Sequence, residues 1–310
     1  MKKSKTSLLY IDKFSKINSN YYWLKYFNRI APVHNLDVDT ELNKKAFFNS
    51  MPVSHIHLGG SVKHDKVPLD WLKTAKKKFN PTITVFYGDA KPSDYHRTLT
   101  RVADKIYFSN KSYVKELNDE LGIKLCSYMP CPTDPEVFKP YPLKKKYDVI
   151  FIGNNSPILG PERKELVQGL LLNGDFSFKI FGRGWANRTK PVYGEKFAKT
   201  CSSAKIAIGI LDTKWRHLQA YFSNRLVFTM SSGCFYIAPY VPGLSQIFLK
   251  HRHLVWYKSF EELLDLIEYY LRVDKAREKI AKSGMEVVTR RFNFRKSVKK
   301  ILGIERKKRK

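Results

Sequence analysis

Short apolar runs alternate with amphipathic segments through the second half of the chain. Each run ends in a turn residue, and the segment after it carries apolar side chains at helical spacing. The predicted strands are residues 147–152, 176–181, 205–211, 235–238 and 253–257. The predicted helices are 162–172, 193–203, 220–231 and 260–271, with a helix pair over 274–302. This alternation is typical of a parallel β-sheet covered by helices.

The first half follows the same pattern less regularly. Predicted strands over residues 54–58, 82–87 and 105–108 end in Gly59-Gly60-Ser61, Gly88-Asp89 and Ser109-Asn110. Open α/β sheets bind ligands at the carboxyl ends of their strands, so these polar loops mark a binding edge. The Pro- and Lys-rich segment 140–146 is the predicted linker. We therefore expect an N-terminal domain over residues 1–140, a second domain over 141–288, and a basic helix and tail over 289–310.

A helix running into Ser232-Gly233-Cys234 and then a strand is the main local motif. Such a turn lets backbone N–H groups approach an anion, because glycine lacks a Cβ. An ordinary helix end, with Gly233 as its C-cap, explains the same residues. The surrounding residues 213–260 contain six Lys or Arg and no Asp or Glu, which favours a phosphate-bearing ligand.

Charge widens the choice of partners. The 310 residues include 57 basic and 28 acidic side chains, a formal net charge of +29, which attracts nucleic acid, anionic glycans or membrane surfaces. Coding bias toward lysine would give the same excess without any partner. Residues 289–310 hold 11 basic side chains and one acid, and their tip 306–310 has the composition of a mobile basic arm.

Cysteine usage and hydropathy indicate the compartment. Four irregularly spaced cysteines fit neither a disulfide framework nor a zinc site, so a reducing cytoplasm is expected. The apolar run from Leu8 to Ile11 is too short for a signal peptide. The uncharged run 226–249 is broken by glycine and proline, so no membrane span is expected. The residues indicate no oligomeric state.

Several motifs together resemble a known family. Residues 147–301 resemble the C-terminal half of CgeB-like, group-1 glycosyltransferases, and residues 132–138 resemble the segment before their domain crossover. The matching segments are 148–153, 182–185, 225–233, 240–244 with Phe248, 261–264, 269–271 and 277–291. The resemblance implies the GT-B fold, in which two Rossmann-like α/β domains face each other across a cleft and a C-terminal helix returns to the N-terminal domain. It also implies a nucleotide-sugar donor, with UDP expected, and no required metal.

The resemblance assigns donor-binding positions. Arg225, with the turn Ser232, Gly233 and Cys234, is expected to bind the diphosphate, since positioned cations and backbone N–H groups stabilise a leaving phosphate. The strand-end residues Gly153 and Asn154 and the loop residues Gly182, Arg183 and Trp185 are the other nucleotide-binding candidates, although Trp185 would equally suit a core. Lys205, Lys214 and Arg216 are weaker candidates. Many relatives carry a glutamate for the donor sugar or ribose where this chain has Phe228, so donor contacts must come from elsewhere.

The acceptor hydroxyl needs a base from the N-terminal half. Asp89 stands at a predicted strand end, where a carboxylate reaches a ligand, or hydrogen-bonds its own turn. His57 shares one face of its strand with His55 and precedes Gly59-Gly60; a packed interior histidine is the alternative.

The excess charge predicts a polyanionic acceptor. By analogy with viral enzymes of this architecture, we expect 5-hydroxymethylpyrimidine bases in double-stranded DNA. Two alternatives stay open: transfer to a cell-surface glycan or protein, and a non-catalytic basic DNA-binding protein on the same scaffold. A dinucleotide oxidoreductase is disfavoured, because no G-x-G-x-x-G follows a predicted strand.

Overall fold

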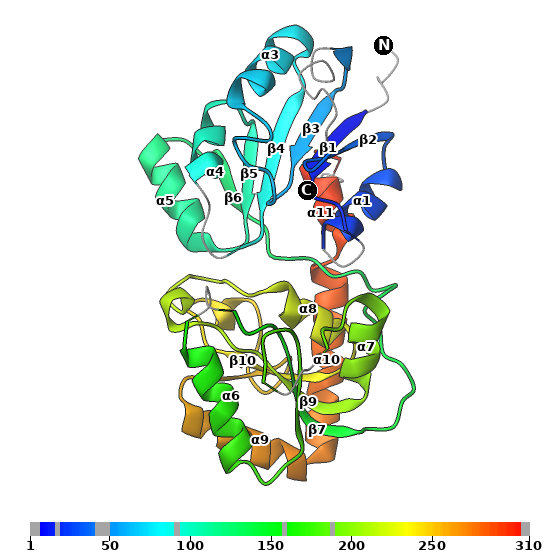
Figure 1. Ribbon diagram of the computed structural model, residues 1–310, viewed down its shortest axis with the longest axis vertical. Helices are drawn as coiled ribbons and strands as arrows, with labels where there is room; N and C mark the ends of the chain where they lie inside the picture. The colour runs from blue at the N-terminus through cyan, green and yellow to red at the C-terminus, as the bar shows by residue number, and fades with distance from the viewer. Residues whose placement is uncertain are drawn as a thin grey trace, which may run out of the picture. The chain divides into compact units, whose positions relative to one another are not determined.

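The computed structural model describes residues 7–15, 19–40, 50–89, 94–156, 160–186 and 190–304. The chain forms two compact units (Figure 1). Unit 1 comprises Met1–Pro130 together with Phe294–Lys310, and unit 2 comprises Cys131–Asn293. The sequence placed the divisions after residues 140 and 288 instead. The tip 306–310 lies outside the described residues.

Unit 2 contains a five-stranded parallel sheet. Its strands are β7 (Tyr147–Ile152), β8 (Phe178–Phe181), β9 (Ala204–Ile208), β10 (Phe235–Pro239) and β11 (Val255–Tyr257). Their order is β11-β10-β9-β7-β8, so β7 and β9 are neighbours although β8 separates them in sequence. This arrangement creates a topological switch point between β7 and β9, and ligands of such sheets bind outside the carboxyl ends of those strands.

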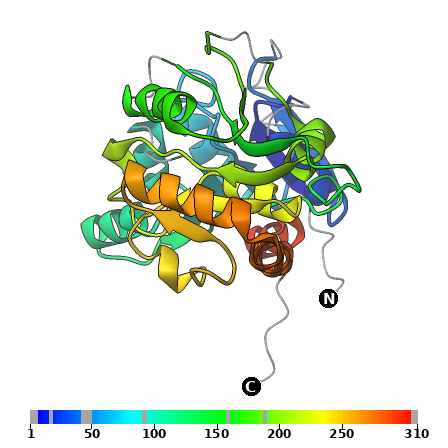
Figure 2. The same cartoon turned by 90° about the horizontal axis from the view of Figure 1, so that it is seen from below.

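Five helices connect and cover this sheet. They are α6 (Glu162–Asn173), α7 (Gly194–Ser202), α8 (Asn224–Ser231), α9 (Phe260–Arg272) and α10 (Asp274–Arg291). Short 3-10 turns occupy Thr213–Trp215 and Leu244–Gln246. Ser259 caps α9 by accepting a hydrogen bond from the backbone N–H of Glu262. The Glu262 carboxylate in turn accepts a hydrogen bond from Lys258 N, just before the helix. The 18-residue α10 runs vertically in Figure 1 and is seen end-on in Figure 2.

Unit 1 has a six-stranded parallel sheet of related topology. Its strands are β1 (Leu8–Asp12), β2 (Val33–Asp37), β3 (His55–Leu58), β4 (Thr82–Tyr87), β5 (Lys105–Phe108) and β6 (Cys126–Tyr128), in the order β2-β1-β3-β4-β5-β6. Its helices are α1 (Asn20–Asn28), α3 (Leu69–Phe79), α4 (Asp94–Thr98), α5 (Lys111–Leu121) and α11 (Phe294–Ile301), with a 3-10 turn over Leu99–Arg101. A second switch point therefore lies between β1 and β3.

The C-terminal helix returns to unit 1, as the fold prediction required. Figure 1 shows α11 beside α1. Phe294 of α11 packs edge-on against Trp23 of α1, with the ring centroids 5.0 Å apart. Tyr26, which also belongs to α1, stacks its ring on that of Phe294, with the centroids 5.9 Å apart. Val298 and Ile301 bury the remaining apolar face of α11. Each unit therefore has the expected Rossmann-like parallel sheet, and α11 belongs to unit 1.

Several predicted boundaries were wrong. The helix predicted from residue 220 begins at Asn224, because Ala220 has a left-handed backbone with φ of 60°. The strand predicted from residue 253 begins at Val255, because His251 has φ of 61° in the preceding turn. The strand predicted over 205–211 ends at Ile208, since Gly209 opens the loop that leads to the candidate site.

Candidate functional site

Two strand-end loops are joined at the carboxyl edge of unit 2. The Asn154 side-chain oxygen accepts a hydrogen bond from Arg183 N at 2.9 Å, and Asn155 N donates to Arg183 O at 2.8 Å. Trp185 Nε1 donates to Gly153 O at 2.8 Å. The loop after β7 and the loop after β8 therefore act as one structural element.

Close backbone approach explains two of the predicted glycines. A Cβ on Gly182 would lie 2.1 Å from Gly153 O, so only glycine lets these two loops meet. A Cβ on Gly153 would lie 2.9 Å from Arg225 Nη2 and 2.6 Å from the Phe151 ring. Gly153 thus leaves room for a guanidinium beside the end of β7.

Two arginines share this edge of the sheet. Arg225 lies in the first turn of α8, and Arg163 lies in the first turn of α6. Both guanidinium groups lie over the ring of Phe151, with the carbon of the group 5.0 Å from its centroid for Arg225 and 5.9 Å for Arg163. Arg163 Nη1 also donates to Asn154 O at 3.1 Å. The sequence reading missed Arg163, although helix starts after β-strands are common anion sites.

The electrostatics of this arginine pair favour an anionic ligand. Burial lowers the pKa of Arg163, and the neighbouring charge of Arg225 lowers it further. Burial also lowers the pKa of Arg225. Asp212, in the loop after β9, is the buried carboxylate beside them, with Oδ1 3.9 Å from Arg163 Nε. One carboxylate against two guanidiniums leaves a net positive charge, which a phosphate would neutralise.

The predicted turn lies at the other end of α8. Ser232, Gly233 and Cys234 follow the last residue of this helix, at the amino end of β10, so they are not brought together with Arg225. Ser232 Oγ donates back to Phe228 O at 2.8 Å. Gly233 has φ of 73°, the left-handed geometry of a helix end.

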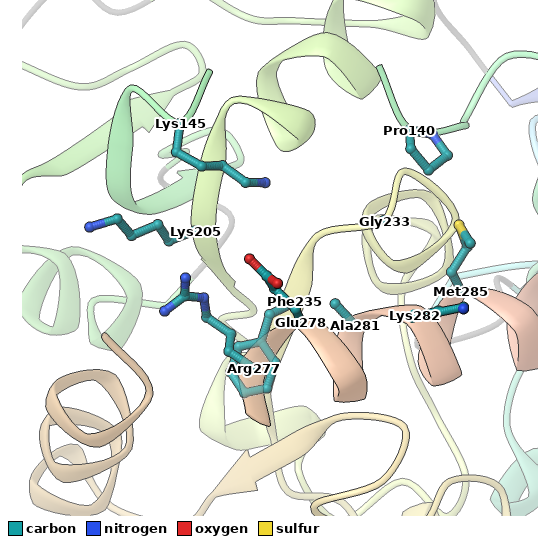
Figure 3. A pocket seen from close by; sticks show the side chains of 10 residues that line it. All are labelled: Pro140, Lys145, Lys205, Gly233, Phe235, Arg277, Glu278, Ala281, Lys282 and Met285. Atoms are coloured by element: carbon teal, nitrogen blue, oxygen red, sulfur yellow. The ribbon is translucent and has the colours of Figure 1, made fainter. Parts of the chain in front are cut away.

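A cavity of about 210 Å³ adjoins this turn (Figure 3). Three of its basic residues have partners: Lys145 donates to two carbonyl oxygens, Lys205 pairs with Asp148 at 2.7 Å, and Arg277 pairs with Asp274. In Figure 3 the Lys205 ammonium points away from the other side chains. Of the other weaker candidates, Arg216 Nε donates to Leu211 O and the Lys214 ammonium lies over Trp215.

The unit 1 candidates lie in different environments. His57 is 1% exposed, and its Nδ1 is 2.8 Å from Thr84 Oγ1, which also contacts His55 Nε2 at 2.9 Å. Burial lowers the pKa of His57 well below its ordinary value. Asp89 follows β4 and is exposed, and desolvation of its carboxylate by nearby protein atoms raises its pKa.

Asp12 is a third carboxyl-edge residue, which the sequence reading missed. It ends β1 at the switch point, and its carboxylate accepts hydrogen bonds from Lys13 N, Ser61 N and the Tyr10 hydroxyl. Burial raises its pKa to about 6. A Cβ on Gly59 would lie 1.6 Å from Asp12 Oδ2, so this glycine makes room for the carboxylate. The signal was the apolar run Leu8–Ile11 ending in an acid.

Metal and membrane features were sought over the described residues alone. Within these ranges, no three His, Cys, Asp or Glu side chains are grouped so that they could hold a metal ion. No helix in the same ranges combines the length and apolar composition needed to span a bilayer.

Comparison with known proteins links this geometry to a family. Residues 163–303 match the glycosyl transferase-like family, a segment that includes Arg163, Asp212 and Arg225. No curated protein matches the chain.

Solved structures match the fold of nearly the whole chain. HepE from Anabaena, solved with UDP and glucose, has a TM-score of 0.69 at 12% identity, covering 97% of this chain and 100% of HepE. Sucrose-phosphate synthase from Thermosynechococcus elongatus has a TM-score of 0.66 at 12% identity, with 96% and 98% coverage. AviGT4, a glycosyltransferase of avilamycin A biosynthesis, has a TM-score of 0.63 at 12% identity, with 96% of each chain covered. The chain therefore has the GT-B fold of these glycosyltransferases, and its residues 163–303 are similar to the glycosyl transferase-like family.

Proposed function

We propose that the protein transfers a sugar from a nucleotide-sugar donor, with UDP as the expected nucleotide, to a hydroxyl acceptor. The observation that carries this proposal is the Arg163 and Arg225 pair at the switch point of unit 2, with one carboxylate beside it. The UDP bound in HepE, a structure of the same fold, supports the choice of nucleotide. Gly153, Asn154, Gly182, Arg183 and Trp185 would form the floor beside the nucleotide.

The arginine pair supplies the main chemical requirement of this reaction. Negative charge develops on the leaving diphosphate as the glycosidic bond breaks. Preorganised guanidinium groups in a partly buried site stabilise that charge more than water does. Arg225 is the diphosphate residue in this proposal, and Arg163 shares the charge while it holds the loop after β7.

Asp89 is the proposed acceptor base. Its exposure at the end of β4 lets it meet a hydroxyl, and its raised pKa brings it closer to the range useful for proton transfer. His57 is less suited, since its ring is buried and bonded to Thr84.

Calorimetric titration with UDP tests the donor site. Arg225→Ala should weaken UDP binding about 10- to 100-fold, the usual effect of losing a hydrogen-bonded charge. Arg272→Ala, which removes an exposed arginine paired with Glu268, is the matched control and should bind UDP as the wild type does. Equal UDP affinity in wild type and Arg225→Ala would contradict the assigned diphosphate residue.

For the acceptor, we propose 5-hydroxymethylpyrimidine bases in DNA. The net charge of +29 supports a polyanionic acceptor, because the donor alone needs few cations. We also propose, on the sequence motifs, that the protein belongs to the CgeB-like subgroup. The number and irregular spacing of its four cysteines support a further proposal, that it works in the reducing cytoplasm.

Incubation with UDP-glucose and hydroxymethylated, or unmodified, duplex DNA tests the acceptor. A hexose mass increment on the modified nucleoside alone is expected, with activity falling steeply as salt rises. UDP release without any increment would point to a glycan or protein acceptor. If the protein neither binds the nucleotide nor releases it from a donor, the alternative of a non-catalytic DNA-binding protein is favoured.

A further inference from the structure

Phe228 lies in α8, three residues after Arg225. Its ring stacks on Phe138 with centroids 3.9 Å apart and planes 4° from parallel. Phe197 meets the same ring edge-on, at 6.1 Å. Phe228 is therefore part of an aromatic cluster within unit 2, and α8 itself carries no carboxylate.

Asp212 is the buried carboxylate at the nucleotide edge. It is 1% exposed and lies in the loop after β9, the strand next to β7. Its Oδ1 has no hydrogen-bond partner among the residues that the structure describes, and the same holds for Nε of buried Arg163. Such atoms are costly to bury unless something pairs with them.

The two atoms are complementary and closely spaced. Arg163 Nε carries a hydrogen to donate, and Asp212 Oδ1 accepts one. They are 3.9 Å apart, too far for a direct hydrogen bond and near enough for one atom placed about 2.8 Å from both to bridge them. That atom must accept one hydrogen bond and donate another, which a hydroxyl group does.

We propose that Asp212 and Arg163 together bind one hydroxyl group of the nucleotide-sugar donor, an inference that rests on the proposed function. A phosphate oxygen would be repelled by the Asp212 carboxylate, and an ammonium group by Arg163. Asp212 thus supplies the carboxylate that α8 lacks. The hydroxyl belongs either to the ribose or to the transferred sugar, both of which extend from the diphosphate.

Titrations of UDP, UDP-glucose and 2′-deoxy-UDP into wild type and Asp212→Asn test the site. Asparagine keeps the shape and removes the charge, so UDP-glucose should bind about 10- to 100-fold more weakly. If a ribose hydroxyl is bound, the substitution weakens UDP binding as much as UDP-glucose binding. If that group is the 2′-hydroxyl, 2′-deoxy-UDP binds wild type and Asp212→Asn with the same affinity. If the sugar hydroxyl is bound, UDP is unaffected.

The controls separate this proposal from the proposed function. Asp148→Asn makes the same change at the amino end of β7, where Asp148 pairs with Lys205, and should bind all ligands as the wild type does. Thermal melts confirm that each variant is folded. A folded Asp212→Asn protein that binds UDP and UDP-glucose as tightly as wild type overturns the inference. That result is expected if a water molecule, and not the donor, bridges Asp212 and Arg163. A wild type that binds none of the ligands overturns the proposed function instead.

Discussion

Two strand-end loops meet at the carboxyl edge of the unit 2 sheet, where the Gly153 and Gly182 backbones approach each other closely. Gly153, Asn154, Gly182, Arg183, Trp185 and Arg225 meet there, as expected from strand-end loops of a parallel sheet. Ser232, Gly233 and Cys234 do not, because a helix-to-strand turn and a strand-to-helix turn lie at opposite edges of such a sheet, and both use small polar residues.

Arg163 and Asp212 escaped prediction for different physical reasons. Arg163 lies in the first turn of a helix, where an arginine is ordinarily solvated, and its burial depends on packing against Phe151. Asp212 immediately precedes the stretch 213–260, whose lack of acids predicted a phosphate-bearing ligand, so it was left out of that segment. Its role depends on proximity to α6, which no spacing within the sequence reveals.

Phe228→Glu tests whether the aromatic cluster has replaced a ligand contact. A carboxylate between Phe138 and Phe197 would be poorly hydrated, so we expect a loss of roughly 2–4 kcal/mol in unfolding free energy. Urea denaturation measures this loss, and UDP-glucose affinity should not improve. Tyr269→Glu, at a site 56% exposed, is the control and should unfold like the wild type. Tighter UDP-glucose binding by a stable Phe228→Glu would contradict this assignment.

At the scale of elements, long amphipathic helices and strands bounded by turn residues were predictable. Strands β4, β5 and β7 have the predicted limits. Strand β1 was missed, because all five of its residues are buried and so give no alternation of polar and apolar positions. The start of α8 was predicted too early, because the preceding residues are equally apolar. Only the left-handed backbone at Ala220 keeps them out of the helix.

The helix α11 should be essential to unit 1. Phe294→Ala removes a fully buried ring from contact with Trp23 and Tyr26, and should cost about 3–5 kcal/mol of unfolding free energy. Hydrogen exchange resolved by peptide should show faster exchange in α1 and β1, with unit 2 peptides unchanged. Ile304→Ala, at a residue 43% exposed, serves as the control. Unchanged exchange in α1 of the Phe294→Ala protein would contradict this packing.

At the scale of the whole molecule, three buried histidines should make unit 1 sensitive to acid. Burial lowers the pKa of His55 and His96 to about 4, and that of His57 well below its ordinary value of 6.5. Between pH 6.5 and 4 the unfolded chain therefore binds up to three more protons at these sites. Asp12 acts oppositely, because its pKa of about 6 when folded exceeds its ordinary 3.8.

For these four groups, the net difference of about two protons makes stability fall as pH falls, by roughly 2–3 kcal/mol per pH unit within that window. Urea midpoints between pH 7 and 5 measure this slope. His96→Gln should reduce it by about 1.4 kcal/mol per pH unit, and His217→Gln, at an exposed site, should leave it unchanged. Hydrogen exchange should show unit 1 losing protection first. A flat pH dependence would mean that the histidines are accessible to protons in the folded state.

The division of unit 1 between the two ends of the sequence has a consequence for biosynthesis. All of unit 2 is contiguous in Cys131–Asn293, whereas unit 1 needs Phe294 and the rest of α11 to cover Trp23. Domains commonly fold in the order in which the ribosome produces them. Here translation of unit 1 begins before that of unit 2 but is completed after it, so the aromatic side chains of α1 stay uncovered until α11 has left the ribosomal tunnel.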